Sequence, residues 1–167
     1  MQFDNSNLHQ KIRIRNNVYK FDVNFDNIVE FFSGEGNITQ FWSKICKNVI
    51  SIDQDESKLE KINIINVEKI HGNNLNYLHL SESIEIIDCD SYGECIDFIE
   101  KILKISKTDK KLIFFTDGFC KVQKKKKRLN YNFDDSINSL NPSESFYEKA
   151  TGGNVYYGYL YFKGLLK

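Results

Sequence analysis

The sequence has 167 residues, 41% of them hydrophobic, with equal numbers of basic and acidic residues and a formal net charge of zero at pH 7. This length fits one domain, since domains commonly contain about 100–150 residues. A neutral chain gives no overall attraction to nucleic acid or to an acidic membrane surface. No stretch approaches the ~18 apolar residues of a membrane helix, and the N-terminal segment has no signal-peptide hydrophobic region. We therefore expect a soluble, cytoplasmic protein that does not bind a membrane.

The first 27 residues are polar and contain two short stretches in which apolar and polar residues alternate. These stretches cover residues 12–15 and 18–23. Asn16 and Asn17 lie between them and tolerate the positive φ of a hairpin turn. This pattern predicts an N-terminal β extension over residues 1–27, followed by a single domain over residues 28–167.

One stretch after this extension has the order of a nucleotide-binding unit. Its parts are an apolar run at 28–32, a small-residue turn at 33–37, a predicted helix at 38–45, a second apolar run at 49–52 and then Asp53. Strand, glycine turn, helix, strand and acid follow one another as in a βαβ nucleotide-binding unit. Gly34 and Gly36 allow a sharp turn and close approach to a ligand. Asp53 stands near the interval of about 20 residues expected for an acid that binds ribose.

The rest of the chain predicts further strands alternating with helices. Predicted strands cover residues 66–70, 83–88 and 111–115, and predicted helices cover residues 57–61 and 94–105. Residues 129–148 are polar and predict a loop with a short helix, whereas the aromatic segment 154–162 predicts a final strand. We expect an α/β fold: a Rossmann-like, doubly wound, mostly parallel sheet with an antiparallel C-terminal strand.

Two motifs resemble those of class I S-adenosylmethionine-dependent methyltransferases. The segment EFFSGEGNIT resembles their motif I, of the form (D/E)-x-F-x-G-x-G, and SIDQD resembles the acid that follows it. The segment DCDSYG is similar to the D-x-D-P-(Y/F)-G segment of the tRNA guanine-N2 methyltransferases, although Ser91 replaces the proline. The resemblance covers about residues 28–118 and implies S-adenosylmethionine as cofactor.

The resemblance also implies roles for individual residues. Glu30 would lie near the methionine amino group and Asp53 would bind the ribose. Asp88 and Asp90 would orient an acceptor amine toward the cofactor methyl group, and Tyr92 would stack on a target base. The residues implied at the cofactor are Glu30, Phe32, Ser33, Gly34, Gly36, Asp53, Gln54, Asn73 and Asp88.

Simpler interpretations of these residues remain open. Asp88 and Asp90 also suit a solvated turn at the end of a strand, and an aromatic side chain such as Tyr92 also caps a core. Cys89 is more typical of a packed thiol than of the nucleophile of a covalent cytosine-C5 mechanism, because neither a Pro-Cys pair nor a flanking catalytic motif supports that role. The histidines and cysteines show no metal-ligand spacing, so we expect no metal.

The basic run Lys124–Arg128 suits phosphate contacts and, equally, an exposed loop. The expected function is methylation of an amino nitrogen in an RNA or DNA base, with nucleic acid as substrate. The alternative is a methyltransferase-like module that binds without turnover. A dinucleotide-dependent oxidoreductase is disfavoured, because its third glycine would fall at Thr39.

Overall fold

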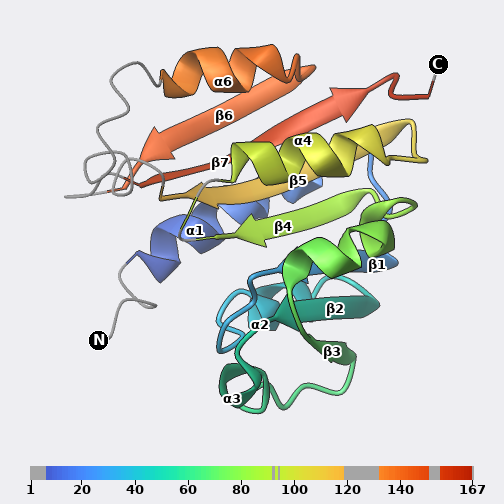
Figure 1. Ribbon diagram of the computed structural model, residues 1–167, viewed down its shortest axis with the longest axis vertical. Coiled ribbons are helices and arrows are strands. Elements are labelled where there is room, and N and C mark those ends of the chain that lie inside the picture. The colour runs from blue at the N-terminus through green and yellow to red at the C-terminus, as the bar shows by residue number, and fades with distance from the viewer. Residues whose placement is uncertain (1–6, 92, 94, 119–131, 151–154, 167) are drawn as a thin grey trace.

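The strands of the protein form one twisted sheet. The computed structural model describes residues 7–91, 93, 95–118, 132–150 and 155–166. The strands within these ranges are β1 (Asn27–Phe31), β2 (Asn48–Asp53), β3 (Val67–His71), β4 (Ile86–Asp90), β5 (Lys110–Asp117), β6 (Glu144–Lys149) and β7 (Tyr156–Lys163). They lie in the order β3-β2-β1-β4-β5-β7-β6 (Figure 1). Strands β1 to β5 pair in parallel, and β7 is antiparallel to both β5 and β6. The predicted Rossmann-like fold class is confirmed.

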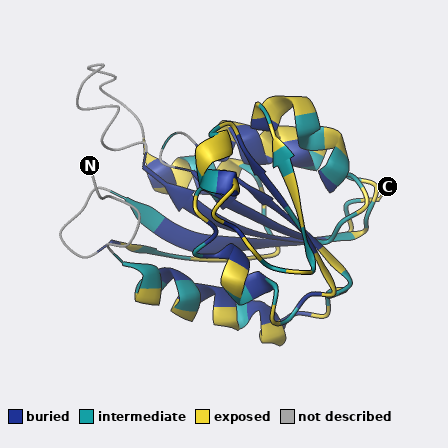
Figure 2. Ribbon diagram, turned by 90° about the horizontal axis from the view of Figure 1, so that it is seen from below, coloured by how far each residue is buried: buried dark blue, intermediate teal, exposed yellow. Residues whose placement is uncertain are grey.

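Helices cover both faces of this sheet. They are α1 (Leu8–Arg15), α2 (Thr39–Trp42), α3 (Glu56–Leu59), α4 (Ile96–Lys104) and α6 (Phe133–Ser139), with 3₁₀ helices η1 (Asn16–Lys20) and η2 (Asn74–Ser81). Side chains of α4, α6 and η2 belong to the apolar cluster on one face, and those of α1, η1 and α2 to the cluster on the other. Strands β1, β2, β4, β5 and β7 are therefore largely buried between two layers, whereas the edge strands β3 and β6 are more exposed (Figure 2).

The parallel strands bring their carboxyl ends to one edge of the molecule. In the register of the sheet, Glu30 of β1 lies beside Ser51 of β2 and Asp88 of β4. Alternate residues of a strand point to opposite faces, so these polar side chains share the face that α1 and α2 cover. This arrangement places the polar groups of three strands beneath the N-terminal helix.

Residues 8–20 are helical, which corrects the β extension predicted for residues 1–27 in the part of that segment that the structure describes. Helix α1 buries Lys11, Ile14 and Arg15, and Val18 of η1 follows one turn later. This spacing of three, four and seven residues belongs to a helix. The alternation suggested a strand because two of the buried positions carry charges, which a hydrophobicity pattern assigns to solvent.

Two further elements differ from the prediction. Residues 144–149 form strand β6 rather than part of a loop, and Glu144–Lys149 pair with β7 along their length. The helix expected over residues 38–45 is reduced to the single turn of α2. A single turn aligns too few peptide dipoles to attract an anion to its N-terminus as a longer helix does.

Candidate functional site

A cavity of about 370 Å³ lies at the carboxyl ends of β2, β1 and β4. Asp53 lies at the β2 end of the cavity and Asp90 at the β4 end, with the glycine turn between them. Leu8 and Lys11 of α1 contribute a further wall. Ligands of open α/β sheets bind at this edge, near the reversal of strand order, and the volume suits a small molecule. The cavity is therefore the candidate ligand site.

The turn after β1 has an unusual backbone conformation. Phe32, Gly34 and Gly36 all have positive φ angles, of 64°, 56° and 80°. Glycine adopts such angles without steric penalty, but a bulky residue such as Phe32 does so only when its surroundings enforce it. The Phe32 N–H donates to Asn74 Oδ1 at 3.2 Å, and the Ser33 N–H donates to the Ile52 carbonyl at 3.1 Å. These contacts hold the turn beneath the cavity.

Asp53 connects this turn to the end of β2. Its Oδ2 accepts a hydrogen bond from the Gly34 N–H at 2.8 Å, and its Oδ1 accepts one from the Asp55 N–H at 2.9 Å. A carboxylate oxygen can accept more than one hydrogen bond. Asp53 is therefore held in position and keeps acceptor capacity toward the cavity, which the neighbouring Gln54 also lines.

Ser33 provides a buried polar group that the protein leaves unsatisfied. Its side chain lines the cavity, the residue is 7% exposed, and Oγ has no hydrogen-bond partner among the described residues. Buried hydroxyl groups nearly always have a partner. A polar ligand in the cavity would supply one.

The asparagine after β3 that lines the cavity is Asn74, one residue after Asn73, the residue expected from the sequence. Asn73 is exposed and accepts a hydrogen bond from the Leu75 N–H at 3.0 Å, as the N-cap of η2. Its neighbour Asn74 is buried and lines the cavity instead. The role implied for Asn73 at the cofactor stays a prediction.

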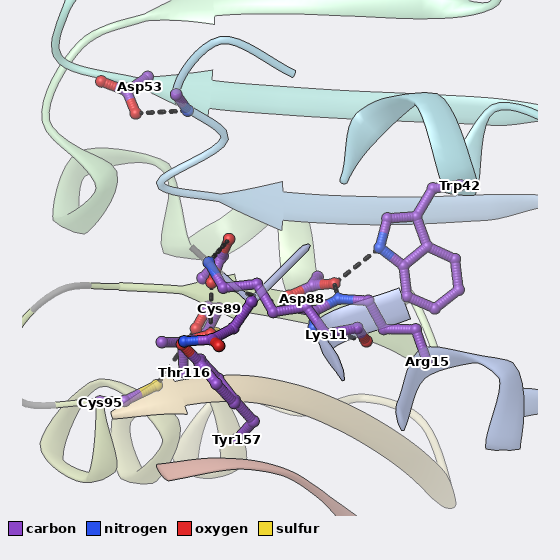
Figure 3. A network of polar contacts seen from close by, with 12 residues as sticks. Lys11, Arg15, Trp42, Asp53, Asp88, Cys89, Cys95, Thr116 and Tyr157 are labelled. Carbon is purple, nitrogen blue, oxygen red and sulfur yellow. Dashed lines mark hydrogen bonds and ion pairs between the residues drawn. The ribbon is translucent and has the colours of Figure 1, made fainter. Parts of the chain in front are cut away.

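Asp88 is enclosed in an ion pair beneath α1. Arg15 donates to its carboxylate from Nε at 2.5 Å and from Nη2 at 2.6 Å, and Trp42 Nε1 donates at 2.7 Å (Figure 3). Both Arg15 and Asp88 are 0% exposed. Burial raises the pKa of Asp88, but three donors, two of them from a guanidinium, favour the ionised carboxylate at neutral pH. Asp88 lies behind the cavity rather than in its lining.

Asp90 is the acid of this pair that reaches the cavity. It accepts hydrogen bonds from Lys11 Nζ at 2.7 Å and from the Thr116 hydroxyl, and its side chain is 14% exposed. Burial alone would raise the pKa of Asp90, but the charges of Lys11 and Arg15 outweigh burial and lower it below its usual value. Asp90 is therefore an ionised acceptor at the β4 end of the cavity.

Glu30 lies deeper in the same polar layer. Its Oε2 accepts hydrogen bonds from Thr39 at 2.5 Å and Ser51 at 3.2 Å, whereas Oε1 has no partner among the described residues. Burial, reinforced by the charge of Asp88, raises the pKa of Glu30 to about 8. Glu30 is therefore mainly protonated at neutral pH. The two aspartates differ from it because each pairs with a cation of α1, Asp88 with Arg15 and Asp90 with Lys11.

The sequence-predicted site residues are brought together only in part. Phe32, Ser33, Gly34, Asp53, Gln54 and Asp90 line the cavity, whereas Gly36, Glu30, Asn73 and Asp88 do not. Tyr92 and Lys124–Arg128 lie outside the described residues. Cys89 is fully buried in the apolar cluster on the α4 face, where it does not line the cavity.

Sequence reasoning missed the contributions of α1 and α2. Lys11, Arg15 and Trp42 complete the acid network from segments distant in sequence. The spacing of four residues between Lys11 and Arg15, which matches one helical turn, was the available signal. Within the described ranges, no helix is long and apolar enough to cross a membrane, and no three side chains of metal-ligating type converge.

No protein-family model matches the sequence, and no curated protein does. Solved structures are similar in fold. A putative O-methyltransferase from Klebsiella pneumoniae has a TM-score of 0.61 and 15% identity, over 93% of this chain and 80% of that chain. N-methyltransferase NodS from Bradyrhizobium japonicum WM9 has a TM-score of 0.66 and 9% identity, over 98% and 99% of the two chains.

A third structure of similar fold was solved with SAH bound. The plantazolicin methyltransferase BpumL, in complex with a pentazolic desmethylPZN analog and SAH, has a TM-score of 0.62 and 12% identity, over 93% of this chain and 84% of that chain. At identities of 9–15% the likeness concerns the fold. The chain has a Rossmann-like methyltransferase fold.

Proposed function

We propose that the protein is an S-adenosylmethionine-dependent methyltransferase. The observation that carries this proposal is the cavity across the ends of β2, β1 and β4, with Asp53 at one end and the ionised Asp90 at the other. The unsatisfied hydroxyl of Ser33 between these ends supports a polar ligand. S-adenosylmethionine in this fold would supply a methyl group activated by a sulfonium centre.

Residues at the β2 end suit the nucleoside half of this cofactor. Asp53 is held by two backbone N–H groups and can accept hydrogen bonds from ribose hydroxyls. Gln54 and Asn74 add amide groups to the same cavity. Gly34, which has a positive φ angle, lines the cavity without a side chain that would obstruct the ligand.

Residues at the β4 end suit an acceptor with an N–H group. Asp90 is ionised and reaches the cavity, so its carboxylate can accept a hydrogen bond from an amine and orient the nitrogen lone pair. Asp88 contributes indirectly, because it anchors Arg15 and α1 behind Asp90. We therefore assign the acceptor contact to Asp90 and a positioning role to Asp88.

We propose that the methyl group is transferred to an amino nitrogen of a nucleic-acid base. Support for it comes from the sequence: the similarity of DCDSYG to the guanine-N2 methyltransferase segment, the aromatic Tyr92 and the basic run Lys124–Arg128. Stacking on an aromatic side chain and phosphate contacts are how unpaired nucleotides are bound.

Ligand binding tests the cofactor assignment first. S-adenosylhomocysteine should raise the melting temperature of the protein, whereas NAD should not. Asp53→Asn should weaken S-adenosylhomocysteine about tenfold or more in calorimetry, because a donor replaces one acceptor oxygen. Asp55→Asn is the matched control, since Asp55 does not line the cavity. Equal stabilisation by NAD, or an unchanged affinity in Asp53→Asn, would contradict the assignment.

Transfer of a tritiated methyl group tests the reaction. The wild-type protein should label RNA or DNA, and Asp90→Asn should lose most of the incorporation while it still binds S-adenosylhomocysteine. Labelling of small amines but not of nucleic acid would remove the nucleic-acid part of the proposal and keep the enzyme.

A second candidate function is a binding module without turnover. The observation that favours it is the engagement of both aspartates by α1, since Arg15 pairs with Asp88 and Lys11 pairs with Asp90. Cofactor binding together with no transfer to RNA, DNA or small amines would select this candidate over the enzyme.

A further inference from the structure

Lys11 is a buried cation in the wall of the cavity. It extends from α1 and is 4% exposed, although lysine is seldom buried. Its ammonium lies 2.7 Å from Asp90 and 5.7 Å from the centre of the Tyr157 ring. Figure 3 shows Lys11 extending toward the carboxyl end of β4, whereas Asp53 lies at the end of β2. A positive charge is thus held at one end of the cavity.

The positions of Asp53 and Lys11 at opposite ends of the cavity set the direction in which a bound nucleoside would extend. Asp53 ends β2 and Asp90 ends β4, with β1 between these strands. Neighbouring strands are about 4.8 Å apart, so the two ends are separated by about 10 Å. A nucleoside whose ribose binds Asp53 would therefore direct its 5′ substituent across the glycine turn toward Lys11.

We propose that Lys11 recognises the carboxylate of the cofactor's amino-acid end, so that α1 selects S-adenosyl ligands whose amino acid is intact. This inference rests on the proposed function. A carboxylate attracts an ammonium strongly in a partly buried site, where solvent screens the charges less than at the surface. Asp90 fixes the position of the ammonium, and the buried Ser33 hydroxyl adds a second donor in the same cavity.

The other lysine of the cavity suits a different role. Lys58 lies on α3, which follows β2, and lines the cavity together with Asp53 and Gln54. It therefore belongs to the nucleoside end, whereas Lys11 belongs to the amino-acid end. This separation makes Lys58 a matched control for a change at Lys11.

Two ligands that differ only in the amino-acid end test the inference. S-adenosylhomocysteine contains the nucleoside, the sulfur and the amino acid, whereas 5′-methylthioadenosine lacks the amino acid. In calorimetry, Lys11→Met should weaken S-adenosylhomocysteine about tenfold or more, the loss expected for one charge-assisted hydrogen bond. It should change the affinity for 5′-methylthioadenosine less than about twofold, because that ligand has no carboxylate.

Controls separate charge recognition from folding. Lys11→Arg keeps the positive charge and should recover most of the affinity for S-adenosylhomocysteine. Lys58→Met should not weaken one ligand more than the other. Equal weakening of both ligands by Lys11→Met, or weakening of neither, would overturn the inference. If the wild-type protein binds neither ligand, the proposed function is wrong. If it binds both ligands but Lys11→Met does not discriminate between them, only the role of Lys11 is wrong.

Discussion

The Arg15 guanidinium donates two hydrogen bonds to the Asp88 carboxylate, and neither side chain is exposed to solvent. This pair joins α1 to the end of β4 and brings Lys11, one helical turn earlier, to Asp90. Trp42 of α2 donates to the same carboxylate. The candidate site therefore depends on an ion pair whose two side chains do not line the cavity.

Removal of the guanidinium should destabilise the protein strongly. Arg15→Met leaves the Asp88 carboxylate buried without its charge partner, and such a change lowers the free energy of unfolding by about 3–5 kcal/mol. Urea unfolding followed by the fluorescence of Trp42, the single tryptophan, measures this value. Arg13→Met is the control: its exposed pair with Glu148 should contribute less than about 1 kcal/mol. Similar losses in both variants would contradict the importance of the buried pair.

Glu30 should make the protein less stable as pH rises toward neutrality. Burial raises its folded pKa from the ordinary value of 4.5 to about 8. Its stabilising contribution is therefore complete below pH 4.5 and is lost as pH rises through the folded pKa. Glu30→Gln keeps the shape and the acceptor oxygen but removes the titration.

The wild-type protein should lose stability as pH rises, whereas Glu30→Gln should not lose this contribution. The free energy of unfolding of the variant minus that of wild type should therefore increase by up to about 1.4 kcal/mol per pH unit between about pH 5 and 8. Urea unfolding at intervals across this range measures it. A difference that does not vary with pH would show that Glu30 titrates normally in the folded protein.

The sheet could be predicted from the sequence because its strands carry their own signals. The apolar runs that became β1, β2, β4 and β5 are fully or largely buried, as expected for parallel strands covered on both faces. Strand β6 had no such signal, because its burial is low along its length and its position depends on pairing with β7.

The part of the site that could be predicted from the sequence is the part formed by one continuous segment, from the glycine turn to Asp53. The glycine turn and Asp53 are close in sequence and follow two apolar runs, so the order along the chain alone placed them at the ends of strands, where the Gly34–Asp53 hydrogen bond joins them. The partners of Asp88 and Asp90 come from α1 and α2, at sequence separations of 73, 79 and 46 residues. Local pattern cannot indicate such contacts, and it treats buried Lys11 and Arg15 as solvated charges.

Lys111 should give the opposite pH dependence to Glu30, in a higher range. Its ammonium donates to the Ser81 and Ile84 carbonyls at 2.7 Å each, and burial lowers its pKa from 10.5 to about 8. Between these values the unfolded chain binds more protons at Lys111 than the folded protein does, so the contribution of Lys111 to the free energy of unfolding should rise with pH. Each pKa unit corresponds to about 1.4 kcal/mol.

The measurement is the difference in the free energy of unfolding between wild type and Lys111→Met, from urea unfolding between pH 7.5 and 9.5, a range that spans the folded pKa of about 8. The difference cancels the opposite trend of Cys46, because burial raises the pKa of that thiol from 9.0 to about 12. Lys111→Met should lose the rise and should also be destabilised by about 1–3 kcal/mol, because two carbonyl groups lose their donor. Lys110→Met is the neighbouring control, since its side chain is partly exposed and pairs with Asp22. A rise that persists in Lys111→Met would assign the titration to another group.

Gly36 should tolerate alanine less well than Gly164, although both have positive φ angles, of 80° and 68°. A Cβ at Gly36 would lie 2.6 Å from Ile62 Cγ1, whereas a Cβ at Gly164 would meet nothing within 4 Å. Gly164→Ala therefore isolates the left-handed backbone term, about 1–2 kcal/mol, and Gly36→Ala adds crowding to it. Ile62→Ala removes the crowded atoms, so the double variant with Gly36→Ala should be more stable than the sum of the single losses implies. Urea unfolding of the four variants gives the coupling, and a loss in Gly36→Ala no larger than in Gly164→Ala would show that the turn relaxes away from Ile62.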